Sequence, residues 1–312
     1  MAHISTEALM MVKYFIVFSL SSVLFLSLPA TAAMRVFACE PEWAALVKEL
    51  AGDDVKVDSA TRPSQDPHYV QARPSLISKI RRADLLVCTG ADLEAGWLPL
   101  LLRKGSNKRI QVGQPGYLMI ADTLRLKDIP ASLDRSEGDV HAAGNPHLQT
   151  DPRNMLPAAE AIMKRLSMLD SENADLYRKN LAEFELRWQD AIAAWEQEAA
   201  PLRGVPVVVY HRSWVYLQDW LGLEEVASLE PKPGVPPGSS YLANVLGRTK
   251  GLSGLLIIHS QYQESKAINW FSSQSGAPVV LLPSTVGGTA EAKDLFSWYE
   301  DIVTRLLKAQ GR

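Results

Sequence analysis

The sequence of 312 residues contains few cysteines, no excess of basic residues and only one long uncharged hydrophobic run. Two cysteines are too few for a disulfide scaffold or for a cysteine-rich zinc or iron–sulfur cluster. There are 32 Lys and Arg against 35 Asp and Glu, so the formal net charge is −3. This balance lacks the basic footprint of a nucleic-acid-binding protein. The content of 47% hydrophobic and 21% charged residues is that of a globular protein and argues against a disordered or fibrous chain.

The single uncharged run lies near the N-terminus. Lys13 precedes the run Phe15–Leu28, and the small residues Ala32 and Ala33 follow it. A basic segment, an apolar segment of about 7–15 residues and a small-residue cleavage site are typical of a secretory signal peptide. The run is shorter than the ~20 apolar residues that a membrane span needs, although an uncleaved N-terminal anchor is the alternative. We therefore predict that residues 1–33 are a signal peptide and that the exported chain is not inserted in the membrane.

Short apolar runs alternate with segments of helical spacing through the rest of the chain. This alternation predicts α/β lobes with parallel sheets. The segment from Ser171 to Ala200 has the spacing of one helix of about 45 Å at 1.5 Å per residue, long enough to run from one lobe to the next. We predict an N-terminal lobe at 34–170, a linking helix within 171–203 and a C-terminal lobe at 204–312. The strands are expected at 36–39, 55–57, 83–88, 205–210, 255–258 and 279–282.

The two cysteines each end a predicted strand. Cys39 follows the first strand and Cys88 ends the third. Export to an oxidising compartment permits a disulfide between them. Two buried free thiols are the alternative, and the sequence does not choose between these states.

Three histidines have surroundings that favour metal binding. His68 and His147 each follow a proline, which stiffens its loop. His211 directly follows the strand at 205–210, and ligands of parallel α/β sheets bind beyond the carboxyl ends of the strands. Three imidazoles with an open fourth position are a known zinc arrangement. The sequence therefore predicts a zinc site formed by His68, His147 and His211. The alternative is that these histidines lie in loops or cap helices and bind no metal.

Several short motifs along the mature chain follow one order and spacing. They are Gln65–His68, Ala72–Ser75, Ala83–Val87, Thr89–Glu94, Gly144–His147 with Asp151 and Pro152, and Val208–His211 with Trp214, Tyr216 and Leu217. This set resembles the zinc- and manganese-type solute-binding proteins of bacterial ABC transporters over essentially the whole mature chain. The resemblance implies two α/β lobes bridged by a long rigid helix, with metal held in the cleft. It also implies a periplasmic monomer without enzymatic activity, which delivers its ion to a membrane permease.

The resemblance also assigns roles to the three histidines. His68 and His147 match family ligands from the first lobe, and His211 matches the first ligand of the second lobe. A histidine at this third position resembles the zinc members, whereas manganese members tend to have Glu there. The chemistry agrees, because imidazole suits Zn²⁺ while carboxylate and water oxygens suit Mn²⁺. Zinc is therefore the expected ion, and manganese or another divalent metal is the alternative.

The chain departs from the family pattern in two places. The family usually supplies an Asp as fourth ligand after the strand at 279–282, but Leu282–Thr285 contains no carboxylate. Water, Glu230 or His259 could take the fourth position. Many zinc members also carry a His-rich acidic loop, whose counterpart at 129–146 has few candidate ligands. These are Asp134, Glu137, Asp139 and His141.

Further roles stay open at this point. Asp139 and His141 could collect metal, with a solvated loop as the alternative. Asp66 and Asp151 could orient imidazoles from the second layer around a metal, or they could cap local turns. A zinc hydrolase that uses the same three histidines and a bound water is an alternative function, with Glu230 as the only candidate general base.

Overall fold

The computed structural model describes residues 33–130, 138 and 140–311 of the chain. The predicted signal peptide lies outside these residues except for Ala33, and the candidate ligands Asp134, Glu137 and Asp139 lie outside them as well. Met34–Arg312 form one compact unit. Among the helices in the described ranges, none is both long and apolar enough to cross a bilayer.

The N-terminal lobe is built on a four-stranded parallel sheet of order β2-β1-β3-β4. Side chains alternate between the two faces of each strand, and in the central strands β1 and β3 both faces are buried, as is usual in a parallel sheet. Phe37 and Leu86 belong to a core with α3 and α4, whereas Val36 and Val87 belong to the larger core with α2. The elements are β1 (Arg35–Ala38), α2 (Pro41–Ala51), β2 (Lys56–Ser59), α3 (Pro74–Arg82), β3 (Leu85–Cys88), α4 (Leu98–Gly105) and β4 (Tyr117–Met119).

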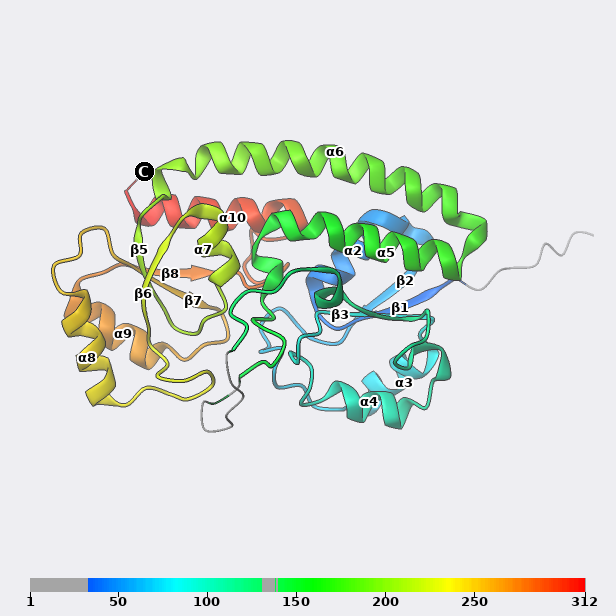
Figure 1. The fold of residues 1–312 in the computed structure, drawn as a ribbon, viewed down its shortest axis with the longest axis horizontal. Coiled ribbons are helices and arrows are strands. Elements are labelled where there is room, and N and C mark those ends of the chain that lie inside the picture. The colour runs from blue at the N-terminus through cyan, green and yellow to red at the C-terminus, as the bar shows by residue number, and fades with distance from the viewer. Residues whose placement is uncertain (1–32, 131–137, 139, 312) are drawn as a thin grey trace, which may run out of the picture. The chain divides into compact units, whose positions relative to one another are not determined.

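The C-terminal lobe repeats this strand order. Its parallel sheet runs β6-β5-β7-β8, so in each lobe the first strand lies between the second and the third. Helices α8 and α9 cover one face, and α7 and α10 pack on the other side (Figure 1). The elements are β5 (Pro206–Val209), α7 (Val215–Leu221), β6 (Glu224–Ser228), α8 (Ser239–Thr249), β7 (Leu256–Ser260), α9 (Ser265–Ser275), β8 (Val279–Leu282) and α10 (Leu295–Ala309). The shared order places a topological switch point in each lobe, where ligands of open α/β sheets bind.

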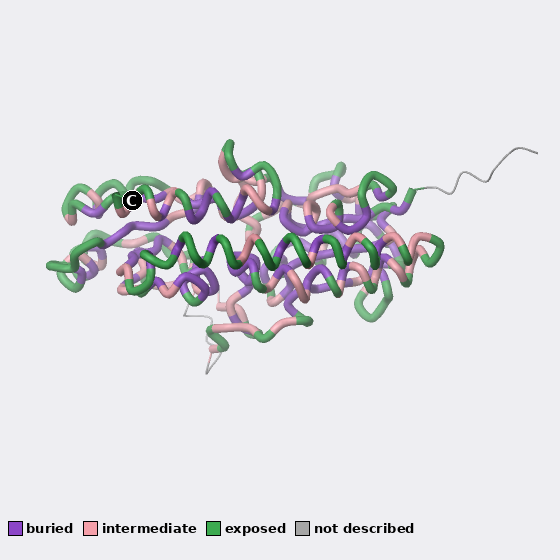
Figure 2. Tube along the Cα trace, turned by 90° about the horizontal axis from the view of Figure 1, so that it is seen from above, coloured by how far each residue is buried: buried purple, intermediate pink, exposed green. Residues whose placement is uncertain are grey.

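One long helix connects the lobes. α6 (Ala174–Glu198) packs against α2 and α5 (Met155–Leu169) of the first lobe and against α10 of the second (Figure 1). Its buried face carries Tyr177, Leu181, Phe184, Trp188 and Trp195 at helical spacing. Buried and exposed residues alternate along it when it is seen from above (Figure 2). The helix of 25 residues is about 37 Å long, and the buried stripe from Tyr177 to Trp195 covers about 27 Å of it.

The helix is shorter than the sequence predicts. Residues Ser171–Asn173 form a 3-10 turn, so α6 begins at Ala174 rather than at Ser171, and it ends at Glu198 rather than at Ala200. The Asp170 carboxylate accepts hydrogen bonds from Asn173 Nδ2 and Tyr177 Oη. These bonds hold the chain in the turn and delay the start of the helix.

A disulfide joins the ends of two neighbouring strands. Cys39 follows β1 and Cys88 ends β3, and their Cα atoms lie 4.7 Å apart in the bonded pair. β1 and β3 are paired in the sheet, so the two side chains leave adjacent strand ends. The structure thus selects the disulfide over the free thiols that the sequence left open.

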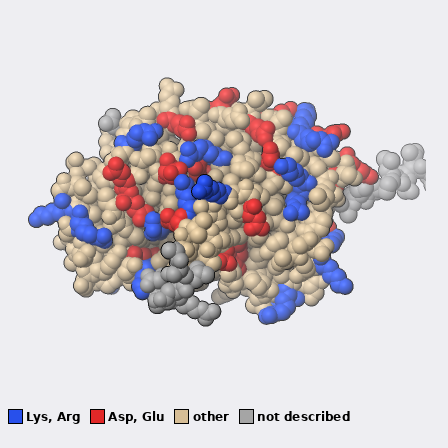
Figure 3. Space-filling model, viewed as in Figure 1, with Lys and Arg blue, Asp and Glu red and all other residues tan. Residues whose placement is uncertain are grey.

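Charges of both signs are distributed over the surface. Lys and Arg side chains are interspersed with Asp and Glu on the face shown in Figure 3. Ion pairs on the described surface include Lys164 with Glu160, which are both exposed, and the exposed Arg187 with the partly buried Glu49. This mixed pattern agrees with the near-neutral balance of the sequence.

Candidate metal centre

The structure brings His68, His147 and His211 together. One ring nitrogen of each lies within 4.8 Å of a ring nitrogen of the other two. The ring centroids are 5.4, 5.7 and 5.5 Å apart for the pairs 68–147, 68–211 and 147–211. A tetrahedral zinc ion with Zn–N bonds of about 2 Å would hold imidazole centroids about 5 Å apart. The three rings therefore already have the spacing of three corners of such a site.

Two carboxylates orient two of the rings. Asp66 Oδ1 lies 2.7 Å from His68 Nδ1 and also accepts the backbone N–H of His68. Glu230 Oε2 lies 2.6 Å from His211 Nδ1 and accepts the backbone N–H of Gly234. A carboxylate at Nδ1 places the proton there and leaves Nε2 with a free lone pair for a metal. Both rings are thus fixed in the tautomer that a metal ligand needs.

His147 is held by its loop. Its backbone N–H donates to Asn145 Oδ1, and Thr150 Oγ1 donates to its carbonyl oxygen. Asn145 Nδ2 donates to the carbonyl of Arg212, which follows His211, so one side chain ties the first-lobe loop to the second-lobe loop. Gly144 has φ +122°, and a Cβ there would lie 2.7 Å from the Lys127 carbonyl oxygen, so the turn requires glycine. The Gly-Asn-Pro-His motif therefore builds a rigid support for the ligand.

The electrostatics of the centre favour a neutral His147 imidazole. His147 is 3% exposed, and burial, followed by the nearby charges of His68, His211 and His141, holds its pKa well below the ordinary value. Burial acts to raise the pKa of Asp66, but the hydrogen bonds and charge of His68 outweigh it and the pKa is lowered. Asp66 is therefore ionised where it contacts His68.

Two of the three rings have a buried nitrogen without a hydrogen-bond partner among the described residues. These atoms are Nε2 of His68 and Nε2 of His147. A cavity of about 170 Å³ is lined by His141, His147 and His211. Buried polar atoms in folded proteins are normally paired, so these nitrogens point to a ligand that binds between them. Convergent neutral imidazole nitrogens bind borderline-soft divalent ions such as Zn²⁺.

The other candidate residues have different positions. Glu230 is engaged at His211 Nδ1, so that oxygen is not available as a fourth ligand or as a general base. His259 lies in β7 with Nδ1 3.0 Å from the Ser260 carbonyl, and it does not belong to the group whose ligand atoms meet. Beyond β8, Ser284 N–H donates to Gln261 and Thr285 Oγ1 donates to Glu42. His141 does lie beside the trio, with its ring centroid 5.4 Å from that of His68.

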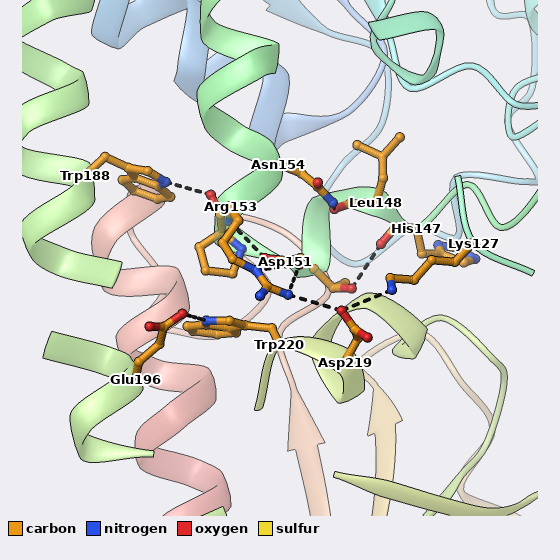
Figure 4. A network of polar contacts seen from close by, with 12 residues as sticks. Lys127, His147, Leu148, Asp151, Arg153, Asn154, Trp188, Glu196, Asp219 and Trp220 are labelled. Atoms are coloured by element: carbon orange, nitrogen blue, oxygen red, sulfur yellow. Dashed lines mark hydrogen bonds and ion pairs between the residues drawn. The ribbon is translucent and has the colours of Figure 1, made fainter. Parts of the chain in front are cut away.

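Asp151 caps a turn and does not orient an imidazole. Its carboxylate accepts the backbone N–H of Arg153 and pairs with the Arg153 guanidinium. The guanidinium reaches on to Asp219 of α7 at 3.2 Å, and Lys127 lies 3.0 Å from the same oxygen (Figure 4). Of the two roles considered for Asp151, the structure shows the cap. The network links the segment after His147 to the C-terminal lobe.

Sequence reasoning missed Asn145 as a link between the lobes and the role of Glu230 at His211. Asn145 lies in the motif that carries the resemblance, but an Asn before Pro is also common in ordinary turns. Glu230 lies 19 residues from His211, and only the pairing of β5 with β6 brings the ends of these strands together.

A family comparison decides the class of the chain. Residues 36–309 match the family described as zinc-uptake complex component A, periplasmic. The chain belongs to this family. The match spans both lobes and all three histidines, and so agrees with the resemblance that the motifs indicated.

Individual relatives are similar to the chain at low identity. The zinc-binding lipoprotein AdcA of Streptococcus pneumoniae R6 is 23% identical over 84% of this chain, which spans only 52% of that protein's length. The manganese ABC transporter substrate-binding lipoprotein PsaA of Streptococcus pneumoniae is 29% identical over 89% of this chain and 88% of its own. A solved crystal structure of ZnuA has a TM-score of 0.71 at 21% identity, and the match covers 90% of this chain and 99% of that one. The structural likeness establishes the two-lobed α/β fold.

Proposed function

We propose that this chain is a periplasmic substrate-binding protein that captures Zn²⁺ and delivers it to the permease of a metal ABC transporter. The observation that carries the proposal is the convergence of His68, His147 and His211 with their ligand atoms within 4.8 Å. Membership of the zinc-uptake family and the relation to substrate-binding lipoproteins for zinc and manganese support the transport role. In this function residues 1–33 serve as an export signal, and lobes 34–170 and 204–312 act as a monomer across the linking segment 171–203.

The donor set favours zinc over manganese. The group whose ligand atoms meet contains three imidazoles and, among the described residues, no carboxylate. Mn²⁺ prefers carboxylate and water oxygens, whereas imidazole suits Zn²⁺. The carboxylates of Asp66 and Glu230 face the rear nitrogens of His68 and His211. They therefore act on the metal through the imidazoles.

The same geometry supports binding without turnover. A zinc hydrolase needs a general base beside the metal-bound water. The only carboxylate that the sequence offers for this role, Glu230, bonds to His211 Nδ1 and to a backbone N–H. Capture and release of the ion need no such base.

A metal titration of the purified protein tests the proposal. Zn²⁺ and Mn²⁺ are titrated separately by calorimetry, with His147→Ala and the matched control His259→Ala. We expect the wild type and the control to bind one Zn²⁺ much more tightly than Mn²⁺, and His147→Ala to lose zinc affinity by at least about 100-fold, because a buried ligand is removed. Wild-type zinc affinity in His147→Ala would overturn the site, and tighter binding of Mn²⁺ would overturn the choice of ion.

A further inference from the structure

A small polar cavity lies between the lobes, beside the metal centre. It has a volume of about 20 Å³, and a cavity needs about 10–15 Å³ to hold one water molecule. Of the three candidate metal ligands only His147 lines it, so the cavity is separate from the space between the three rings. Both lobes contribute to its wall, among others with Glu40, His147, Gln149, Ser213, Trp214 and Tyr262.

Three side chains around this cavity each carry a buried polar atom whose hydrogen bonding is incomplete. Glu40 Oε1, Gln149 Oε1 and Trp214 Nε1 are buried and have no hydrogen-bond partner among the described residues. The three residues are 3%, 5% and 0% exposed. Buried polar atoms in folded proteins are normally paired, either with the protein or with an ordered water. Three such side chains around one small cavity therefore indicate a molecule that binds there.

The kinds of atom identify this molecule. The indole N–H of Trp214 can only donate a hydrogen bond, whereas the amide oxygen of Gln149 can only accept one. A cation in the cavity would lie against the N–H group, and an anion would lie against the amide oxygen, so neither suits both side chains. A water molecule accepts a hydrogen bond from Trp214 and donates one to Gln149, and it can form a third bond in addition.

Glu40 supplies the third partner because its other oxygen is held elsewhere. Oε2 of Glu40 accepts hydrogen bonds from the backbone N–H and the hydroxyl of Thr89. The same N–H donates to Glu94 Oε1, so Oε2 is the oxygen of Glu40 that faces Glu94. Burial, followed by the charge of Glu94, raises the pKa of Glu40. A water molecule pairs with Oε1 in either protonation state, because it donates to a carboxylate and accepts from a carboxylic acid.

The cavity joins the two segments that carry metal ligands from different lobes. Gln149 lies two residues after His147 in the first lobe, and Trp214 lies three residues after His211 in the second. Asn145 links these segments directly, through its hydrogen bond to the carbonyl that follows His211. A water molecule between Gln149 and Trp214 forms a second link, and a water-mediated link is enthalpically nearly as good as a direct hydrogen bond.

We propose that this cavity binds one ordered water molecule, which accepts a hydrogen bond from Trp214 Nε1 and donates one to Gln149 Oε1, with Glu40 Oε1 as its third partner. This water holds the His147 and His211 segments in register across the lobes. Gln149 and Trp214 are thus positioning residues of the metal centre. Their effect on zinc affinity rests on the function proposed above, whereas the water site itself does not.

High-resolution crystallography of the metal-free protein, together with zinc calorimetry, tests this proposal. The variant is Gln149→Met, which removes the acceptor at similar size, and the matched control is the exposed Gln274→Met. In the wild type and the control we expect density for one water about 2.7–3.2 Å from Trp214 Nε1 and Gln149 Oε1. In Gln149→Met we expect its occupancy to fall below about half. Zinc affinity should fall about 3–10-fold in Gln149→Met and stay within about twofold in the control.

The outcomes separate the water site from the proposed function. A wild-type cavity without a water, a direct bond between Trp214 and Gln149, or a metal ion with contacts shorter than about 2.6 Å would overturn the site. Loss of the water in Gln149→Met with wild-type zinc affinity would overturn its role in register. Either result leaves the proposed function standing if His147→Ala loses zinc. Melting of the metal-free variants identifies any loss of affinity that comes from unfolding, and the density in the wild type decides the site in that case.

Discussion

Two clusters of titratable side chains lie at the carboxyl ends of strands, and they differ in how their polar atoms are satisfied. In the metal centre, the rear nitrogens of His68 and His211 are bonded to carboxylates, whereas the buried Nε2 atoms of His68 and His147 have no partner among the described residues. In the second cluster, formed by Glu40, Glu42 and Glu94, both oxygens of Glu94 and one oxygen each of Glu40 and Glu42 are bonded to the protein, whereas Glu40 Oε1 is buried without a partner among the described residues. Glu94 accepts the backbone N–H groups of the two residues that follow β3, and Glu42 accepts a hydroxyl hydrogen bond from beyond β8.

This difference separates a binding site from a structural site. Position at strand ends does not distinguish the clusters, because both occupy the place where α/β proteins bind ligands. The number of unpaired atoms that meet does, since the buried Nε2 atoms of His68 and His147 belong to one convergent group, whereas Glu40 Oε1 is the one buried oxygen without a partner among the described carboxylates of its cluster. The carboxylate cluster instead stabilises the fold: Glu42 of α2 bonds across to Thr285 after β8, and the disulfide at Cys39 and Cys88 lies beside it.

The pKa shifts also differ between the two clusters: the pKa values of the carboxyls are raised, and that of His147 is lowered. Burial raises the pKa of Glu42 to about 7 and that of Glu94 to about 7, and burial with the charge of Glu94 raises the pKa of Glu40. These carboxyls therefore favour the protonated, neutral form. The pKa of His147 in the metal centre is shifted downward, which also favours the neutral form. His147 and the three carboxyls thus each favour the form without buried charge, but only the neutral imidazole presents a lone pair that suits a borderline-soft metal.

The largest effect is expected on removal of the disulfide beside the carboxylate cluster. The bond closes a loop with a sequence separation of 49 residues. The double substitution Cys39→Ala and Cys88→Ala should lower the free energy of unfolding by about 4 kcal/mol, because the unfolded chain regains loop entropy. Urea denaturation of the metal-free protein measures this loss. Zinc affinity of the folded variant should stay within about threefold of the wild type, and a collapse of affinity would show that the two clusters are not independent.

The next effect concerns the pH dependence of stability. Glu42 has a pKa of about 7 in the folded protein, against an ordinary value of 4.5, so its contribution is present below pH 4.5 and is lost as the pH rises through 7. Glu42→Gln is neutral throughout and can keep a bond to Thr285. Between about pH 5 and about pH 8 the variant should gain about 2 kcal/mol of unfolding free energy relative to the wild type.

Thermal and urea unfolding in the presence of a chelator measure this difference. His147, whose lowered pKa acts in the opposite direction, is common to both proteins and cancels in the comparison. A pH profile that is parallel in the two proteins would mean that Glu42 is ionised in the folded state and that the cluster carries charge.

A third prediction tests whether the carboxylates that contact the Nδ1 atoms of the candidate ligands contribute to metal binding. Glu230→Ala removes the partner of His211 Nδ1 and should weaken zinc binding about 10–100-fold, the usual cost of losing such a partner. The exposed Glu264→Ala serves as the matched control and should leave affinity unchanged. Calorimetry at fixed pH checks both. Equal affinities in the two variants would show that Glu230 does not orient the ring.

Much of the fold follows from the sequence because buried parallel strands are continuous apolar runs. Such runs predicted β1, β3, β5, β7 and β8, and the short segment 55–57 predicted β2, whose sequence Lys56–Ser59 is neither apolar throughout nor buried. The strand β6 was missed because its sequence Glu224–Ser228 begins with two acidic residues, as an edge strand allows. The three-residue β4 was too short to show a pattern. The sequence does not predict the strand order that the two lobes share, because apolar runs show where strands lie but not which strands pair with each other.

The sequence predicts the three histidines of the candidate site, but it does not predict which residues contact them. His68 and His147 were found from the adjacent proline, and His211 from the end of its strand. That His141 lies beside His68 depends on how the loop crosses between the lobes, since 73 positions separate the two residues in sequence. Whether Cys39 and Cys88 were bonded depended in the same way on the pairing of β1 with β3.

The smallest effect is expected at the ion pairs that link the lobes beside the metal centre. Asp219 is about half exposed, and its pairs with Arg153 and Lys127 are screened by solvent (Figure 4). Asp219→Asn should therefore change the free energy of unfolding by less than about 1 kcal/mol and zinc affinity by less than about threefold. Asn145→Ala, which removes the direct link between the His147 and His211 loops, should cost more affinity than Asp219→Asn. If calorimetry gives the reverse order, surface charge rather than the Asn145 hydrogen bond holds the two halves of the site in register.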